Sequence, residues 1–379
     1  MSNKVPQLRF NGYSDAWVQR NLGEVVDVKS GRDYKHLSEG DIPVYGTGGY
    51  MLSVDEALSQ NDDAIGIGRK GTIDNPYLLR APFWTVDTLF YAIPRVGFDL
   101  NFTFDIFQKV NWRKLDESTG VPSLSKATIN SVSAAVPSED EQIKIGGLFE
   151  KIDNLIAANQ RKLDLLKEQK KGYLQKMFPK NGAKVPELRF AGFADDWEER
   201  KFGELYKKVN EKNDLSFGKD KVISVANMYF KDTGNIRSDD AYMKTYNIFR
   251  MGDIAFEGNR SKHFSYGRFV ENTIGDGIVS HVFDVFRPIQ QFDLNYWKYA
   301  IHNERVMGPI LMTATTSSTM MTNLVAKDFL KRAILVPSYS EQKLVGSFFK
   351  QLDDTIALHQ RKLDLLKEQK KGFLQKMFV

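Results

Sequence analysis

The chain contains no cysteine among its 379 residues. Disulfide bonds, thiolate metal ligands and cysteine nucleophiles are therefore excluded, and the composition is compatible with a reducing cytoplasm. Histidine is scarce, with five residues, and none has a metal-ligand spacing such as His-Glu-x-x-His. No apolar run approaches the length of a membrane span, and the first residues lack the apolar segment of a signal peptide. We therefore expect a soluble cytoplasmic protein without a metal site or a membrane segment.

Catalytic and cofactor motifs are also missing. The glycines match neither the phosphate-binding loop nor the dinucleotide fingerprint, and no Asn-Pro-Pro-Tyr or Asp-Pro-Pro-Tyr tetrapeptide of methyltransferases occurs. The carboxylate pairs at 62–63 and 239–240 are adjacent in sequence, so on a strand they would point to opposite faces, and we expect them to end turns. We find no nucleophile with a plausible base. The sequence therefore favours a chain that binds no cofactor and is not itself an enzyme.

The most informative feature that is present is an internal repeat. Asn159–Phe178 recurs as His359–Phe378 with only an Asn/His and a Tyr/Phe difference. The start Val-Pro-Gln-Leu-Arg-Phe-Asn-Gly at residue 5 returns as Val-Pro-Glu-Leu-Arg-Phe-Ala-Gly at residue 185, and Val-Pro-Ser occurs at both 136 and 336. Landmarks keep their order while their offset grows from 180 to 200 residues, so we predict one fold used twice, with loop insertions in the second copy.

Positive charge is concentrated in the two repeated segments. Each copy holds six Lys or Arg and two Asp or Glu, so the pair carries +8, whereas the whole chain carries +5. The remainder is therefore near −3. Whole-chain charge is only weak support for nucleic-acid binding.

Both repeated segments lie on predicted long helices. Apolar residues advance in steps of four and three from residues 145 and 345, which is a heptad pattern. Ser138 with Glu141, and Ser338 with Glu341, would form capping boxes at the two starts. Each helix would run for roughly 39 residues, or about 58 Å. The predicted seam consists of Ile152, Ile156, Asn159, Leu163, Leu166, Lys170, Tyr173, Leu352, Ile356, His359, Leu363, Leu366, Lys370 and Phe373.

A seam of this length must be buried, and the other copy is the obvious partner. We predict an antiparallel two-helix coiled coil with Leu163 against Leu366. Asn159 would then face Lys370, and Lys170 would face His359, which lowers the desolvation cost of the seam polar groups. The alternative is two independent amphipathic helices, each packed on its own domain.

The segments before the helices read as two α+β domains. Apolar or alternating runs predict strands at 42–45, 64–67, 84–93, 222–225, 253–256 and 277–286, and helical patterns occupy 101–110 and 295–306. Strand order is not predictable from these patterns. The domain limits that we predict are 1–137 and 185–337 for the domains, 138–178 and 338–379 for the helices, and 179–184 for a linker.

The loops of the two halves differ and favour a polyanion. In the first half, Gly48-Gly49 and Gly66-Ile-Gly68 permit close backbone approach and are followed by Arg69-Lys70. In the second half, Asn259-Arg-Ser-Lys-His263 offers an amide, a guanidinium and a hydroxyl, groups that bind base edges and phosphates. For any single loop the alternative is an ordinary turn.

These residues resemble a known family. The paired Pro-x-Leu-Arg-Phe-x-Gly starts, Ile42-Pro-Val-Tyr-Gly46, Gly68-Arg-Lys-Gly71 and the twin Arg-Lys-Leu helices are similar to those of the specificity subunit of a Type I restriction-modification system. The resemblance implies two target recognition domains that read an asymmetric, bipartite DNA site, and a pseudo-two-fold repeat with the coiled coil as spacer. It also implies two docked modification subunits joined by restriction subunits. S-adenosylmethionine, ATP and magnesium would belong to those partners.

On this interpretation we expect DNA contacts from a small set of residues in the divergent loops. They are Tyr45, Thr47, Arg69 and Lys70 in the first half, and Asn259, Arg260, Lys262 and Arg268 in the second. Two other functions remain possible from sequence alone: a protein-interaction scaffold without DNA contact, and a nuclease with an unrecognised site.

Overall fold

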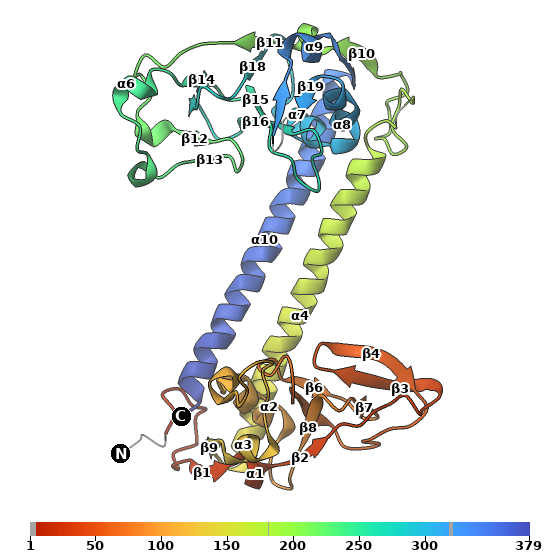
Figure 1. Ribbon diagram of the computed structural model, residues 1–379, viewed down its shortest axis with the longest axis vertical. Helices are drawn as coiled ribbons and strands as arrows, with labels where there is room; N and C mark the ends of the chain where they lie inside the picture. The colour runs from red at the N-terminus through yellow and green to blue at the C-terminus, as the bar shows by residue number, and fades with distance from the viewer. Residues whose placement is uncertain (1–4, 181, 318–320) are drawn as a thin grey trace. The chain divides into compact units, whose positions relative to one another are not determined.

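The computed structural model describes residues 5–180, 182–317 and 321–379. Contacts divide the chain into two compact units (Figure 1). Unit 1 contains Met1–Arg161 with Gln360–Val379, and unit 2 contains Lys162–His359. Both divisions fall inside the repeated segments. Parts of the predicted limits, residue 181 in the linker and residues 1–4 at the start, lie outside the described residues.

The centre of unit 1 is a four-stranded antiparallel sheet with the order β2-β8-β5-β6. A pair β1-β9 and a three-stranded sheet β4-β3-β7 accompany it. The strands are β1 (Val18–Asn21), β2 (Val26–Ser30), β3 (Glu39–Gly46), β4 (Gly49–Val54), β5 (Ala64–Gly68), β6 (Tyr77–Leu79), β7 (Trp84–Thr85), β8 (Leu89–Pro94) and β9 (Ser133–Val136). The helices wholly within unit 1 are α1 (Leu22–Val25), α2 (Leu100–Lys109), the 3₁₀ helix η1 (Trp112–Leu115) and α3 (Lys126–Ser131).

Unit 2 repeats this plan with a four-stranded antiparallel sheet β11-β18-β15-β16 and a pair β10-β21. Three further two-stranded sheets, β12-β13, β14-β17 and β19-β20, are its own. The strands are β10 (Glu198–Lys201), β11 (Tyr206–Val209), β12 (Ile223–Ser224), β13 (Tyr229–Phe230), β14 (Asn247–Phe249), β15 (Ile254–Glu257), β16 (Arg268–Glu271), β17 (Gly277–Val279), β18 (Val285–Pro288), β19 (Thr315–Ser317), β20 (Thr322–Leu324) and β21 (Ala333–Val336). The helices within unit 2 are α5 (Phe202–Leu205), η2 (Lys219–Lys221), η3 (Thr233–Asn235), α6 (Asp240–Met243), α7 (Leu294–His302), α8 (Glu304–Met312) and α9 (Ala326–Lys331).

The matching sheet orders confirm the predicted α+β class and internal repeat. Most predicted elements are present, but two predicted strands were too long. The run 84–93 is divided into β7 and β8, and the run 277–286 into β17 and β18, because turns at 86–88 and 280–284 interrupt the pairing. The predicted helix 295–306 is likewise divided, because Asn303 ends α7 and its side chain caps α8 by accepting a hydrogen bond from the Arg305 amide at 3.2 Å.

Two long helices, α4 (Glu139–Lys176) and α10 (Tyr339–Met377), continue from one unit into the other. In unit 1, Lys370 forms an ion pair with Asp153 at 2.5 Å while Phe378 packs on Phe149. In unit 2, Lys170 pairs with Asp353 at 2.5 Å while Tyr173 meets Phe348 edge-on. The two helices therefore pack antiparallel within each unit. All predicted seam residues are buried or half-buried, whereas the leucines at 155, 165, 358 and 365 are exposed.

The predicted polar pairs of the seam are wrong. Each seam lysine pairs with an aspartate six residues before its predicted partner, Asp153 for Lys370 and Asp353 for Lys170. Lys370 also donates to Gln108 at 2.6 Å. Asn159 donates to the carbonyl of Leu155 at 2.8 Å instead of meeting Lys370. Lys170 pairs with Asp353, and the buried Nδ1 of His359 has no hydrogen-bond partner among the described residues. The physical reason is charge: an ammonium group gains more from a carboxylate than from an amide or an imidazole.

The predicted capping boxes are incomplete, because the glutamates have other partners. Glu141 accepts two hydrogen bonds from Arg9 at 2.6 and 2.8 Å, and its carboxylate is buried. Glu341 forms the same bidentate pair with Arg189 at 2.8 and 2.9 Å. A charged, bidentate guanidinium outcompetes a backbone amide. The repeated Leu-Arg-Phe motif therefore fastens the start of each half to the first turn of a long helix.

The far end of each long helix completes an aromatic core. In unit 1 the ring of Phe378 stacks on Phe102 at 5.3 Å and meets Trp17 at 6.0 Å. In unit 2 the ring of Phe178 stacks on Tyr296 at 5.8 Å and meets Trp197 at 6.2 Å. Each core thus depends on a phenylalanine from the opposite half of the sequence.

We expect Phe378→Ala to lower the free energy of unfolding of unit 1 by about 3 to 5 kcal/mol, the usual cost of removing a buried phenylalanine ring. Leu365→Ala is the matched control, because this side chain of the same helix is 54% exposed and its loss should cost less than about 0.5 kcal/mol. Chemical denaturation measures both. Equal effects of the two substitutions would contradict the role of Phe378.

Candidate nucleic-acid interface

In unit 1 the predicted site combines a hairpin with the loop that follows β5. Tyr45 lies at the end of β3, and its ring contacts Tyr50 at 6.3 Å and Tyr77 at 6.1 Å. Thr47 occupies the turn between β3 and β4. The Tyr77 hydroxyl donates to the carbonyl of Gly46 at 2.6 Å and so fixes this turn. Aromatic packing therefore holds the hairpin tip in one position.

The loop after β5 presents Arg69 and Lys70 to solvent. The amides of both residues donate to the carbonyl of Thr88, at 2.8 and 3.2 Å, so their backbone is fixed. The Arg69 guanidinium lies 5.8 Å from the Phe90 ring. A Cβ placed on Gly71 would lie 3.9 Å from the Thr47 hydroxyl, so the loop and the hairpin turn are neighbours. The structure thus brings together the residues predicted for the first half.

In unit 2 the corresponding loop is organised by a buried carboxylate. Glu257, at the end of β15, accepts a hydrogen bond from the Arg268 Nε at 2.7 Å and one from the Asn259 amide at 3.4 Å. Arg268 also donates to the carbonyl of Ala226 at 2.7 Å and lies over the Phe264 ring. Its guanidinium is therefore engaged by groups of the same unit. Asn259, Arg260 and Lys262 are exposed in the same loop.

Two close backbone approaches explain Gly68, the last residue of β5, and Gly258, which directly follows β15. A side chain on Gly68 would collide with the carbonyl of Thr72, and one on Gly258 with the carbonyl of Thr322. Thr322 is buried, and its amide and hydroxyl both donate to the Gly258 carbonyl, at 2.8 and 3.1 Å. The loops after β5 and β15 therefore begin at equivalent positions in the two units.

Sequence reasoning missed Glu257 and Thr322, which touch the loop without being exposed. A signal existed for Glu257, because an acidic residue closes the apolar run Ile-Ala-Phe immediately before a glycine. A buried carboxylate requires a charged partner. No comparable signal marks Thr322, because it contacts Gly258 across 64 residues of sequence.

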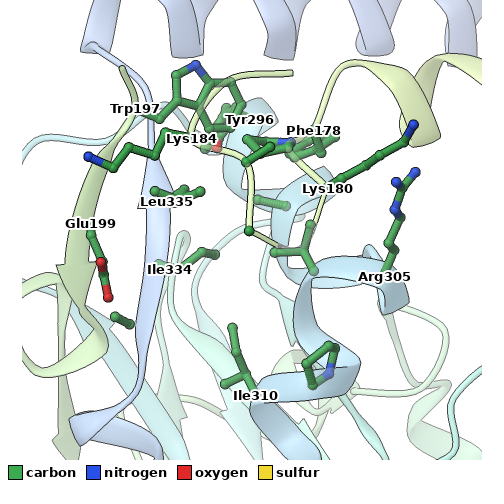
Figure 2. Close-up of a pocket in the computed structure, with 17 residues that line it drawn as sticks. Phe178, Lys180, Lys184, Trp197, Glu199, Tyr296, Arg305, Ile310, Ile334 and Leu335 are labelled. Atoms are coloured by element: carbon green, nitrogen blue, oxygen red, sulfur yellow. The ribbon is translucent and has the colours of Figure 1, made fainter. Parts of the chain in front are cut away.

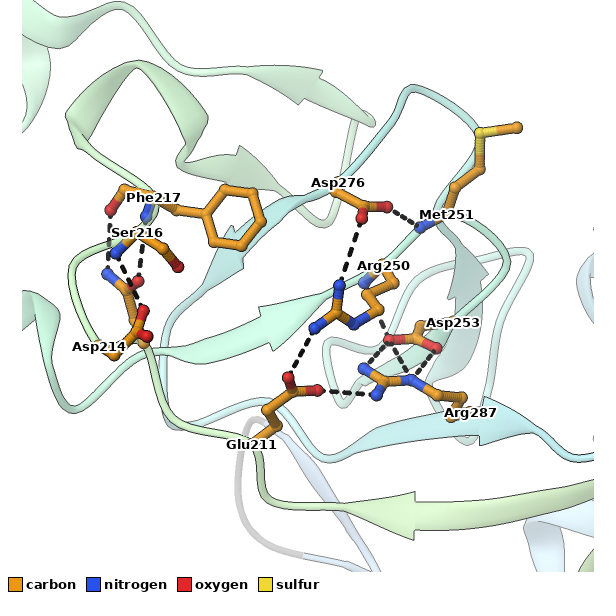
Figure 3. A network of polar contacts seen from close by, with 10 residues as sticks. Glu211, Asp214, Ser216, Phe217, Arg250, Met251, Asp253, Asp276 and Arg287 are labelled. Carbon is orange, nitrogen blue, oxygen red and sulfur yellow. Dashed lines mark hydrogen bonds and ion pairs between the residues drawn. The ribbon is translucent and has the colours of Figure 1, made fainter.

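A second charged network in unit 2 joins Glu211, Arg250, Asp253 and Arg287 (Figure 3). Arg287 donates to buried Asp253 at 2.9 Å and to Glu211 at 2.7 Å, and Arg250 donates to Glu211 at 2.6 Å. Hydrogen bonds from Arg250 and Arg287 lower the pKa of Glu211. Burial raises the pKa of Asp253, opposed by its hydrogen bonds to Arg287. The network links two residues beside strands, Glu211 after β11 and Asp253 before β15, to Arg287 of β18.

Unit 2 also has an apolar groove of about 370 Å³ beside residues 178–180 and 182–184 (Figure 2). Trp197, Tyr296 and Leu335 line it, and Lys180 and Arg305 lie at its rim. Glu199 is the single carboxylate among the lining residues, and no histidine is present there. Its other charged lining residues are Lys180, Lys184 and Arg305.

Within the described residues, no group of three or more His, Cys, Asp or Glu is placed to hold a metal ion. In the same part of the chain, no helix has the length and apolar character needed to cross a membrane.

Comparisons with known proteins point in one direction. The family model for the Type I restriction modification DNA specificity domain matches residues 14–168 and 194–368. The Type I restriction enzyme MjaVIII specificity subunit of Methanocaldococcus jannaschii is 20% identical over 280 residues, covering 68% of this chain. The match spans 64% of the length of that relative. The fold is similar to the crystal structure of the S subunit of a Type I restriction-modification system from M. genitalium. That likeness has a TM-score of 0.66 at 15% identity and covers 99% of both chains.

We expect Glu257→Ala to loosen the second-unit loop. The substitution leaves Arg268 without its charged partner, which should cost about 1 to 3 kcal/mol of stability and accelerate amide hydrogen exchange at residues 258–264. Asn259→Ala is the control, because the hydrogen bond that this exposed side chain donates to the same carboxylate is long, at 3.4 Å. Exchange unchanged by Glu257→Ala would show that the carboxylate does not organise the loop.

Proposed function

Because the chain belongs to the family of the Type I restriction modification DNA specificity domain, we propose that it is the sequence-reading subunit of a Type I restriction-modification complex. Each unit reads one half of an asymmetric, bipartite site in double-stranded DNA. The chain itself performs no chemistry. Methylation and cleavage belong to modification and restriction subunits, which bind S-adenosylmethionine, ATP and magnesium.

The observation that carries this proposal is one scaffold with two different sets of loops. The four-stranded sheets have the same order, yet unit 1 adds the β3–β4 hairpin while unit 2 adds the 259–263 loop and three small sheets. A shared scaffold with unlike loops is suited to two unlike DNA sequences, because loops on rigid elements carry binding specificity. A scaffold protein or a nuclease would not need two such sets.

In unit 1 we assign base reading to Arg69 with Tyr45 and Thr47, and phosphate binding to Lys70. An exposed guanidinium on a fixed backbone suits bidentate contact with guanine, whereas a lysine acts as a point charge. In unit 2 we assign base reading to Asn259 and Arg260, and phosphate binding to Lys262. Arg268 positions their loop through Glu257 and does not read bases.

We also propose that the paired long helices set the distance between the half-sites. Two half-sites about one DNA turn apart, roughly 34 to 36 Å, can be read from one side of the duplex. In this proposal the spacer consists of the predicted helices at 138–178 and 338–379, and each domain ends where its helix begins. Two modification subunits would dock on the chain, one for each half-site.

Base reading and phosphate binding predict different mutant profiles. Arg69→Ala should cost about 1 to 3 kcal/mol on the cognate duplex and relax preference at one position of one half-site, whereas Lys70→Ala should weaken all duplexes alike. Methylation mapping in cells that carry the complete system, followed by binding titrations on the mapped site, measures both. Altered bases in the half-site read by unit 2 would contradict the assignment.

The spacing role predicts the effect of a longer coil. One heptad inserted into each long helix keeps the seam in phase, so both half-sites should be retained while the gap between them changes. Methylation mapping of the variant gives the result. The control is an insertion of the same length in the turn at Val96, which is fully exposed and should leave the gap unchanged. Changed half-site bases in the heptad variant would exclude the spacing role.

A further inference from the structure

Unit 2 contains a cleft of about 650 Å³ that extends from the recognition loop to the long helix α4. His263 of the loop lies at one side of it, and Lys298 and His302 of α7 lie along its wall. Lys167 and Lys171 of α4 close the other side. The loop is tied to this wall, because the Ser265 amide donates to Glu304 at 3.2 Å. The cleft therefore adjoins the residues to which we assign base reading in unit 2.

The lining of the cleft is strongly cationic. Five lysine and arginine side chains line it against two carboxylates, Glu304 and Asp353. Asp353 is already occupied by Lys170 at 2.5 Å and by the Tyr299 hydroxyl at 2.7 Å. Arg305 donates to the carbonyl of Gln175 at 2.8 Å. Three lysines, Lys167, Lys171 and Lys298, remain available to a ligand.

The available lysines converge from two elements. Lys167 and Lys171 are four residues apart on α4, so they lie on the same helix face. Both are exposed, and Lys171 approaches Glu168 only at 4.0 Å. Lys298 projects from α7 with its ammonium 5.5 Å from the Tyr299 ring. An anion between the two helices would meet charge from both sides.

The histidine in the wall of the cleft, His302, is uncharged. Burial, followed by the positive charges of Arg268, Lys298 and Lys170, lowers the pKa of His302 to about 4. His302 is therefore uncharged at neutral pH, so the positive charge of the cleft comes from its lysine and arginine side chains. This is the electrostatic environment of an anion site before its anion is bound.

Among its described residues, unit 1 has no lysine at the position of Lys298, although the part of α10 that it contains repeats the sequence of α4. The residue five places after the helix cap is Lys298 in α7 but Phe104 in α2, counted from the caps Asp293 and Asp99. Phe104 is buried. Lys367 and Lys371 of α10 repeat Lys167 and Lys171, so the chain contains its own matched control.

We propose that this cleft binds the DNA phosphate backbone beside the half-site read by unit 2. The inference rests on the proposed function. Lysine contacts without a planar partner hold phosphates as point charges and carry no base preference. DNA is favoured over an acidic protein segment because the cleft is continuous with the recognition loop. The contacts would fix the orientation of that loop on the duplex.

Salt dependence tests the proposal in the full chain assembled with its modification subunits. Each phosphate contact contributes about −0.9 to the slope of log affinity against log salt. We expect the double variant Lys167→Gln/Lys171→Gln to reduce the magnitude of the slope by about 1.8. It should also weaken binding to mapped and scrambled duplexes by the same factor, roughly tenfold or more at 0.1 M salt. Lys298→Gln alone should remove about half as much slope.

The control Lys367→Gln/Lys371→Gln changes the same residues of the identical helix sequence and should leave the slope within about 0.3 of wild type, since each true contact is worth about 0.9. Equal slope losses in both double variants would mean that DNA is attracted by the general charge of the helices and not by the cleft. That result would overturn the proposal. An unchanged slope with impaired assembly, seen by light scattering, would assign the cleft to a protein partner and also overturn it. If the wild-type complex fails to prefer the mapped duplex, the proposed function fails instead.

Discussion

Each unit depends on a phenylalanine delivered by a helix from the other half of the sequence. Phe378 fills the space between Trp17 and Phe102, and Phe178 fills the equivalent space between Trp197 and Tyr296. The arginine–glutamate pairs at Glu141 and Glu341 fasten the opposite ends of the same helices. Each long helix is therefore anchored by a bidentate ion pair at its start and by a buried phenylalanine at its end. With these anchors, the seam can contain asparagine and lysine, which would weaken an isolated coiled coil.

Anchoring of this kind separates scaffold from specificity. The sheet order and the strand position from which the recognition loops leave, at Gly68 and Gly258, are the same in both units. The loops themselves are stabilised by unrelated means. Unit 1 uses backbone hydrogen bonds to Thr88, whereas unit 2 uses the buried Glu257 carboxylate. A loop can therefore change its chemistry without a change in the core that carries it.

The sequence predicted the repeat, the long helices and the α+β class because these depend on local periodicity and on copied residues. The prediction from sequence failed where the partner of a charged group is distant in the sequence. Glu141 was expected to cap its own helix, yet Arg9 lies 132 residues away and binds it more strongly than an amide could. Lys370 was expected opposite Asn159 and instead reaches Asp153 and Gln108. In the candidate site, composition identified the loops correctly as exposed and polar. It could not show that Arg268 is held by Glu257, because that pairing depends on how β15 and β16 align.

The two units are not equivalent in how their chain segments are distributed. Unit 2 is one continuous stretch, Lys162–His359, whereas unit 1 joins Met1–Arg161 to Gln360–Val379. During synthesis on the ribosome, unit 2 can therefore gather all of its chain before unit 1 does. The aromatic core of unit 1 stays incomplete until Phe378 has emerged, although the rest of that core was synthesised earlier. The half that is translated first is thus the half that finishes folding last, and it has the longest period in which a chaperone or another nascent chain could reach its unfilled core.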